Sequence, residues 1–197
     1  MASLTAPGAP GIRPTWTTNA KDLVTTALGP SRVWVTLGYG ILNEIYWPAT
    51  GWPQIRDLGF IVAGPSGWAE VKRVNRYAVS VPESAGLRVP LPQVTHEGDA
   101  YRLLLEVLPD PNRDVVLISY RLIGEGVKLY CLLAPHLANS GEHNNARAGH
   151  ELTAWKEPCA LCLVSNSGFS RSSAGYVGAS DGFLQKRADD LGIRRGA

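Results

Sequence analysis

The sequence predicts an all-β protein whose strands pair antiparallel in a sandwich or a barrel. About ten short runs rich in Val, Ile, Leu and aromatic residues follow one another at intervals of eight to twelve residues, separated by Gly, Pro and Asn. No stretch alternates strands with helices, which argues against βαβ units. The sequence also contains no internal repeat. With 197 residues, 45 % hydrophobic and 18 % charged, the chain is long enough to bury one sizeable core.

The first residues are expected to contribute no core of their own. Residues 1–15 carry three prolines and two glycines, typical of an extended arm. Residues 16–28 are interpreted as a loop, because two Thr-Thr pairs weaken the helix propensity and Gly29-Pro30 follows. A β-sandwich domain is expected over residues 16–182.

Within that domain, alternating apolar residues and flanking turn residues define the expected strands. They are residues 33–37, 41–46, 57–62, 68–73, 74–81, 101–108, 115–123, 127–134, 151–156 and 159–166. Two prolines make residues 87–94 an edge strand or a loop. Residues 138–150 form a long polar loop. The charged residues 183–197 have weak β signal and are interpreted as a truncated or disordered tail, so the sandwich is expected to be incomplete at its C-terminal end.

Composition and charge narrow the possible partners. A net charge of +2 gives no support for binding to nucleic acid or to a membrane surface. No apolar run is long enough for a transmembrane helix. The N-terminus has neither the basic nor the apolar part of a signal peptide, which predicts a cytoplasmic location.

Residues 37–60 concentrate the unusual residue types. Four aromatic residues lie here among glycines, prolines and charges: Tyr39, Tyr46, Trp47 and Trp52. Aromatic faces beside fixed polar groups suit the apolar surface and the hydroxyls of a sugar ring. Two interpretations remain open, namely a hairpin whose aromatics fill the core, and a contact surface for carbohydrate or a partner.

Catalytic chemistry has weak support in the residues. Glu44 and Asp57 flank the aromatic turn and are the best available pair of carboxylates for glycoside hydrolysis, but salt bridges or hydrogen bonds to a turn are the competing interpretation. No serine lies in a GxSxG context. Gly38-Tyr39-Gly40 lacks the third glycine and the helix of a dinucleotide site. No cofactor is therefore expected.

Metal binding is likewise a minor alternative. The histidines His136, His143 and His150 lie in or beside one loop, but their spacing matches no ligand signature. Cys159 and Cys162 have CxxC spacing without a second pair. Together with Cys131 they are expected to be buried free thiols rather than metal or redox groups.

Several segments in series resemble a known family. They are Pro7-Gly8-Ala9-Pro10-Gly11-Ile12-Arg13-Pro14-Thr15-Trp16-Thr17, Ala20-Lys21-Asp22, Ser31-Arg32-Val33-Trp34, the run from Leu37 to Pro48, Arg56-Asp57-Leu58-Gly59, Leu129 to His136 with Asn139, and Gly175 to Gly182. In this order they resemble the start of bacterial glucoamylases and glucodextranases of glycoside hydrolase family fifteen. The resemblance implies an antiparallel β-supersandwich, similar to mutarotase-like sandwiches. In the family this domain precedes an α/α barrel that hydrolyses α-glucosidic bonds with inversion, using two glutamates.

Nothing in this chain resembles that barrel, so the resemblance implies a non-catalytic N-terminal domain that braces a barrel absent from the chain. Tyr46, Trp47 and Trp52 are then expected to face the barrel and, near its active-site mouth, a glucosyl unit, while Glu44 and Asp57 fix the turn. The alternative is a stand-alone carbohydrate-binding module for an α-glucan. A small hydrolase that uses Glu44 and Asp57 is the third hypothesis.

Overall fold

The computed structural model describes residues 13, 15–84, 86–88 and 91–176. They form two compact units, one of residues 17–134 and one of Trp16 with the residues from Pro135 onward. The strand pairs with a defined register are all antiparallel, which confirms the predicted all-β antiparallel class. The predicted arm 1–15, apart from Arg13 and Thr15, and the predicted tail 183–197 lie outside the described residues.

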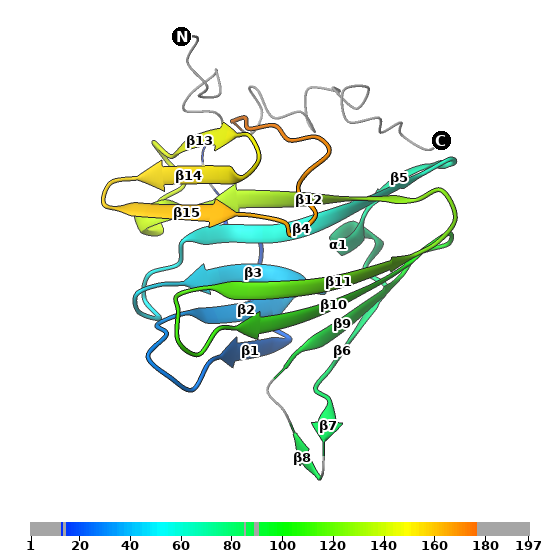
Figure 1. The fold of residues 1–197 in the computed structure, drawn as a ribbon, viewed down its shortest axis with the longest axis horizontal. Coiled ribbons are helices and arrows are strands. Elements are labelled where there is room, and N and C mark those ends of the chain that lie inside the picture. The colour runs from blue at the N-terminus through cyan, green and yellow to red at the C-terminus, as the bar shows by residue number, and fades with distance from the viewer. Residues whose placement is uncertain (1–12, 14, 85, 89–90, 177–197) are drawn as a thin grey trace. The chain divides into compact units, whose positions relative to one another are not determined.

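The first sheet of the unit 17–134 has six strands. Its order is β1-β2-β3-β4-β12, and β5 also pairs with β4 (Figure 1). These strands span Leu23–Thr26 (β1), Trp34–Gly38 (β2), Ile41–Tyr46 (β3), Ile55–Gly64 (β4), Gly67–Glu70 (β5) and Lys128–Pro135 (β12). The register between β2 and β3 shifts between Thr36 and Leu37.

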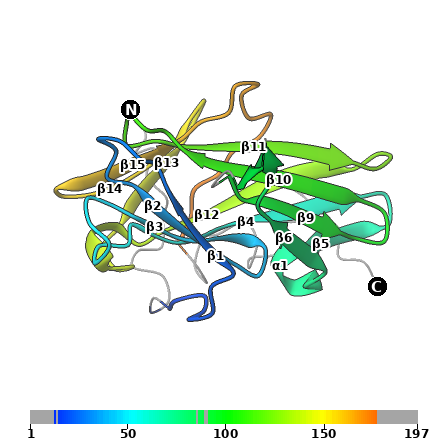
Figure 2. The same cartoon turned by 90° about the horizontal axis from the view of Figure 1, so that it is seen from below.

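The second sheet has four strands in the order β11-β10-β9-β6 (Figures 1 and 2). They span Tyr77–Ser80 (β6), Gln93–Glu97 (β9), Arg102–Pro109 (β10) and Val116–Ile123 (β11). A helical turn, α1 (Val71–Val74), follows β5, and a two-stranded hairpin of β7 (Glu83–Ser84) and β8 (Leu87–Arg88) follows β6.

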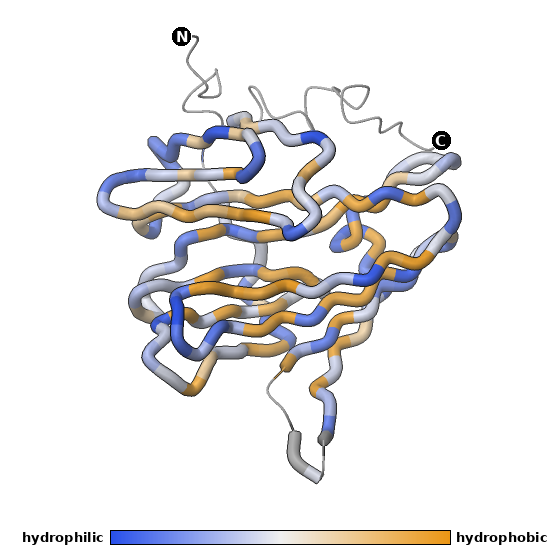
Figure 3. The backbone as a smooth tube through the Cα atoms, viewed as in Figure 1, coloured by the Kyte–Doolittle hydropathy of each residue, from blue (hydrophilic) through white to orange (hydrophobic). Residues whose placement is uncertain are grey.

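The core of this unit lies between the two sheets. Along β10, Leu103, Leu105 and Val107 are buried while the alternate residues are half-buried or exposed, as expected for a strand with one face on a core. The first sheet contributes fully buried residues such as Val35 and Ile41. Figure 3 shows hydrophobic stretches along the strands of both sheets and hydrophilic connections between them.

The second unit is a three-stranded meander. Its order is β13-β14-β15, with strands at Asn145–Ala148, Leu152–Lys156 and Cys159–Leu163. A 3₁₀ turn, η1 (Leu137–Asn139), precedes it. The indole of Trp16 stacks on the imidazole of His136, with ring centroids 4.2 Å apart.

Most predicted strands are confirmed, and the differences are local. Residues 23–26 form β1 instead of a loop. The expected strand 68–73 ends at Glu70 and turns into α1. Residues 93–97 form β9, which lies between two neighbours in its sheet, because Pro90 and Pro92 precede the strand rather than interrupt it. Residues 145–148 of the predicted loop 138–150 form β13.

Candidate functional site

The predicted site residues are divided among three places. Tyr39 lies in the turn between β2 and β3, whereas Tyr46, Trp47 and Trp52 lie at or beyond the other end of β3. A six-residue strand spans about 20 Å, so the aromatic residues do not form one cluster. Glu44 and Asp57 lie between these two ends, in β3 and β4.

The turn at Tyr39 is built for a tight hairpin. Both turn residues have positive φ, 54° at Tyr39 and 68° at Gly40, the combination of a type I′ turn. A Cβ at Gly40 would lie 2.5 Å from the His96 ring and 2.8 Å from the Tyr77 ring, so only glycine fits. The Tyr39 side chain is exposed.

Trp47 is held in a polar clamp. Its indole Nε1 donates a hydrogen bond to Asp114 Oδ2 at 2.6 Å. The guanidinium carbon of Arg32 lies 5.0 Å from the centroid of the same indole, within cation–π range. Asp114 also accepts hydrogen bonds from the backbone N–H and the guanidinium of Arg32. The backbone N–H of Arg32 and the Trp47 indole hold the pKa of Asp114 below its usual value.

The clamp joins the loops at one end of the unit. The backbone N–H of Ser31 donates to the carbonyl of Pro111 at 3.3 Å, so the connection from β1 to β2 meets the connection from β10 to β11. Trp47 brings the connection from β3 to β4 to the same place. One edge and one face of the Trp47 indole are thereby occupied by protein.

Trp52 is presented outward from this end. The backbone N–H of Trp47 donates to the Trp52 carbonyl at 3.0 Å, and the Trp52 N–H donates to Ala49 O at 3.0 Å. Buried Gln54 donates from Nε2 to the Trp47 carbonyl at 2.7 Å. These bonds fix the turn, while the Trp52 side chain stays 49 % exposed.

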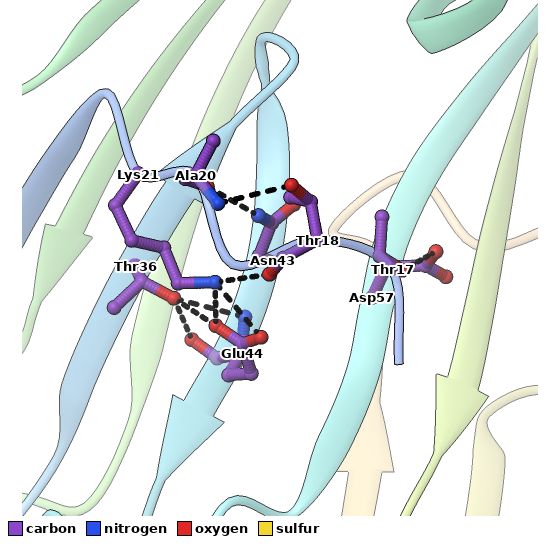
Figure 4. A network of polar contacts seen from close by, with 8 residues as sticks. All are labelled: Thr17, Thr18, Ala20, Lys21, Thr36, Asn43, Glu44 and Asp57. Carbon is purple, nitrogen blue, oxygen red and sulfur yellow. Dashed lines mark hydrogen bonds and ion pairs between the residues drawn. The ribbon is translucent and has the colours of Figure 1, made fainter. Parts of the chain in front are cut away.

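Glu44 is buried in a polar network, with only 5 % of its surface exposed (Figure 4). Lys21 Nζ lies 2.9 Å from its carboxylate, and the Thr36 hydroxyl donates to the same group. Burial, followed by the negative charge of Glu44, raises the pKa of the Tyr46 hydroxyl. The carboxylate therefore has a cationic partner and a hydroxyl donor from the protein itself.

Asp57 is buried in the same way, with 3 % of its surface exposed. The Thr17 hydroxyl donates to its Oδ2 at 2.6 Å (Figure 4), and Lys72 Nζ and Arg56 lie 3.0 and 3.3 Å away. Thr17 and Lys21 belong to residues 17–22, which we call the strap. The strap crosses β3 and β4, and its Asp22 N–H donates to the Leu37 carbonyl at 2.8 Å.

These contacts assign the two carboxylates a structural part. A glycosidase pair needs one protonated acid and one free carboxylate on either side of the sugar bond. Glu44 and Asp57 instead hold the strap through separate sets of partners, Lys21 and Thr36 for the one, Thr17, Lys72 and Arg56 for the other. Both carboxylates hold the strap, and Glu44 also accepts a hydrogen bond from the hydroxyl of Tyr46 at the end of β3.

The remaining candidate chemistry can be located as well. Among the residues that the structure describes, no group of three or more His, Cys, Asp or Glu is arranged to hold a metal ion. All three cysteines are free thiols. Cys159 is buried and Cys131 half-buried, but Cys162 is exposed, so its predicted burial is wrong, because alternate residues of β15 face outward. No helix in the described part of the chain is long and apolar enough to cross a membrane.

Comparison with known families identifies the domain. The sequence model of glucodextranase domain N matches residues 6–190. This chain belongs to the glucodextranase domain N family. The predicted resemblance is therefore confirmed over most of the chain.

Two relatives of this domain N are longer proteins. A glucoamylase of Clostridium sp. (strain G0005) is 27 % identical over 193 residues, which cover 91 % of this chain and 27 % of the relative. A bacterial glucoamylase, solved in complex with acarbose, has the same fold with a TM-score of 0.83 and 23 % identity, over 96 % of this chain and 30 % of that one. The chain thus spans less than a third of the length of either relative.

Sequence reasoning missed several residues that build these places in domain N. Lys21 and Thr17 hold the carboxylates, and Asp114 holds Trp47. Glu70, a third buried carboxylate, pairs with Lys72 at 3.2 Å and with Arg73 at 2.6 Å. Thr17, Lys21 and Asp114 lie far along the chain from their partners, so no local pattern marks them. Glu70 instead pairs with residues two and three positions further along the chain.

Proposed function

We propose that this chain is the non-catalytic N-terminal domain of a glucoamylase-like enzyme, and that it braces a catalytic α/α barrel. The observation that carries the proposal is the state of Glu44 and Asp57. Both are buried and bound by cations and hydroxyls of the chain, which supports a scaffold rather than a hydrolytic site. The enzyme as a whole would act in the degradation of α-glucans.

The end of the unit that carries the Trp47 clamp is the surface proposed to meet the barrel. Its apolar side chains are exposed, with Leu28 92 % and Trp52 49 % exposed. Trp34 and Val115, also exposed, lie at the start of β2 and just before β11. We call Leu28, Trp34, Trp52 and Val115 the apolar rim.

The composition and the support of the rim suit a protein partner. Tryptophan, which supplies two of the four rim residues, is among the side chains that most often carry the binding energy of protein interfaces. Here they lie on loops tied together by the Ser31–Pro111 hydrogen bond and by the Arg32–Asp114 ion pair at 2.7 Å. A rim held in this way loses little conformational entropy when a partner covers it. The longer relatives favour a further domain of the same protein as that partner.

A chimera of the Clostridium glucoamylase tests the brace. In it, this chain replaces the segment that it matches, and we expect the chimera to release glucose from maltooligosaccharides. Leu28→Asp with Trp52→Ala should lower its melting temperature and its activity, because the rim would no longer pack against the barrel. Tyr120→Ala, an exposed aromatic on β11, is the matched control and should change neither. If the rim variant matched the parent chimera in both measurements, the proposal would be rejected.

A carbohydrate-binding module is the second candidate, because Trp52 offers an exposed indole on a fixed turn. It predicts that the isolated chain binds maltooligosaccharide or dextran and that Trp52→Ala abolishes the binding. Trp47→Ala should weaken the binding as well, through loss of the clamp. Calorimetric titration of the chain with both glucans separates this candidate from the brace, which requires no binding by the isolated chain.

A further inference from the structure

A buried histidine holds the β2–β3 hairpin from the opposite sheet. His96, in β9, has 1 % of its surface exposed. Its Nε2 lies 2.7 Å from the carbonyl oxygen of Gly40. A carbonyl can only accept, so Nε2 carries the hydrogen and Nδ1 carries the lone pair of the neutral ring.

The described contacts of the His96 ring include no carboxylate. Its Nδ1 has no hydrogen-bond partner among the described residues. Tyr77 of β6 lies beside it with ring centroids 5.8 Å apart, and Leu103 of β10 is its cross-strand partner. From the hairpin side it meets Gly40, next to Tyr39.

Asp22, which contacts Tyr77, and Glu97, which follows His96 in β9, each have a partner other than His96. Asp22 accepts a hydrogen bond from the Tyr77 hydroxyl at 2.9 Å. Glu97, the next residue in β9, points to the opposite face of the sheet and pairs with Arg102 at 2.8 Å. Burial accordingly lowers the pKa of His96, against a smaller opposing effect of the Gly40 carbonyl.

We propose that His96 is an acid-sensitive lock that holds the Tyr39–Gly40 turn closed in its neutral form and releases it when it is protonated. Protonation would place a hydrogen on Nδ1 with no acceptor and a charge in a buried site, which costs free energy unless the ring leaves. The ring cannot move while Gly40 and Tyr77 stay in place, because both lie against it. Opening the hairpin turn is therefore the way to hydrate it.

The direction of the pH effect follows from linkage. The folded pKa of His96 lies below the value of 6.5 for an unperturbed histidine, so the open state binds more protons than the closed state between the two values. The closed state of the turn has its full stability above about pH 6.5, and this stability decreases as the pH falls towards the folded pKa. For one proton the opening constant rises about tenfold per pH unit in that window.

Amide hydrogen exchange of the full chain between pH 7.5 and 5.5 tests the lock. Below about pH 6.5 the protection factors of residues 38–43 should fall in the native chain, by up to about tenfold per pH unit. In His96→Gln the amide can still donate to Gly40 O and does not titrate, so its protection factors should be independent of pH. His150→Gln, which changes an exposed histidine, should behave like the native chain.

A second measurement does not depend on the folding of the variant. In the native chain, NMR of ¹⁵N-labelled histidine should show His96 as the Nε2–H tautomer with a midpoint below 6.5, and the Tyr39 and Gly40 amide signals should change with the same midpoint. Equal pH dependence of the native chain and His96→Gln would overturn the lock. So would a midpoint at or above 6.5, or turn signals that do not follow His96.

Discussion

At the scale of single residues, two ends of one strand carry different kinds of constraint. At the Trp47 end, the side chain is fixed by hydrogen bonds and by a cation over its ring. At the Gly40 end, the constraint is the absence of a side chain, since His96 and Tyr77 fill the space where a Cβ would lie. Substitutions at the two ends should therefore destabilise the fold for different physical reasons.

Gly40→Ala measures the second constraint. The new methyl group would overlap the buried His96 ring and the half-buried Tyr77 ring, and alanine would occupy a φ of 68° that it rarely adopts. We expect a loss of about 3 kcal/mol in the free energy of unfolding, measured by urea denaturation. Gly51→Ala is the matched control, because a Cβ at Gly51 meets nothing within 4 Å, and it should change the stability by less than about 0.5 kcal/mol. Equal effects of the two substitutions would contradict the packing argument.

At the scale of elements, the strap is held to the first sheet mainly by polar contacts. Thr17 reaches Asp57, Lys21 reaches Glu44, and the Asn43 side chain donates to the Ala20 carbonyl at 3.4 Å (Figure 4). Glu44 and Asp57 lie in the strands, and the groups that satisfy them come in part from the strap. The strap, which is not a strand of the first sheet, therefore supplies polar partners for the two buried carboxylates of that sheet.

A double-mutant cycle tests the dependence of the sheet on the strap. Lys21→Met leaves Glu44 buried without its cation, which should cost about 3 kcal/mol of unfolding free energy. Glu44→Gln removes the charge, so adding Lys21→Met to it should cost much less, and the two effects should be strongly non-additive. Lys128→Met, at an exposed lysine in β12, is the control for loss of a lysine and should be near neutral. Additive effects would show that the pair is not coupled.

The elements also show how far the sequence could predict this fold. The apolar runs and the turn residues that flank them located β3 and β10 to within one residue, because buried strands bounded by turns leave that pattern in the chain. β1 was missed because its four residues are recognisable only through their pairing with β2. The turn α1 ends at Asn75 with φ 54°, a local conformation that apolar periodicity does not report. β13 is polar and is defined by its ladder with β14.

The candidate site was harder to predict than the strands. The aromatic residues from Tyr39 to Trp52 are close in sequence, but β3 carries them to opposite ends of the sheet. The groups that decide their surroundings are Lys21, Asp114 and His96, each brought in by the tertiary fold. A sequence window contains the strand and its turns, but it does not contain these partners.

At the scale of the whole molecule, the chain consists of two compact units. The unit 17–134 contains both larger sheets and the core between them, and it is well above the ~40 residues below which domains need disulfides or metals. The partners named above for Glu44 and Asp57 all belong to this unit. Each of these properties is expected of a unit that folds by itself.

Expression of residues 17–134 alone tests this expectation. The fragment should give dispersed NMR amide signals and a single cooperative unfolding transition, because the strap, the clamp and the His96 contact all lie inside it. The comparison is residues 23–134, which lack the strap and leave Glu44 without Lys21. This shorter fragment should be less stable by several kcal/mol. A disordered 17–134 fragment would contradict the division into units.

The strap also constrains how the family can vary in sequence. Lys21 pairs with Glu44, and Thr17 pairs with Asp57. Loss of one residue of a pair therefore removes the interaction that favours the other. Among relatives of domain N, position 21 should lose its amine where position 44 has lost its carboxylate, and position 17 should lose its hydroxyl where position 57 has become apolar. A short stretch of polar chain ahead of the first strand is then inherited together with two positions in the middle of the sheet.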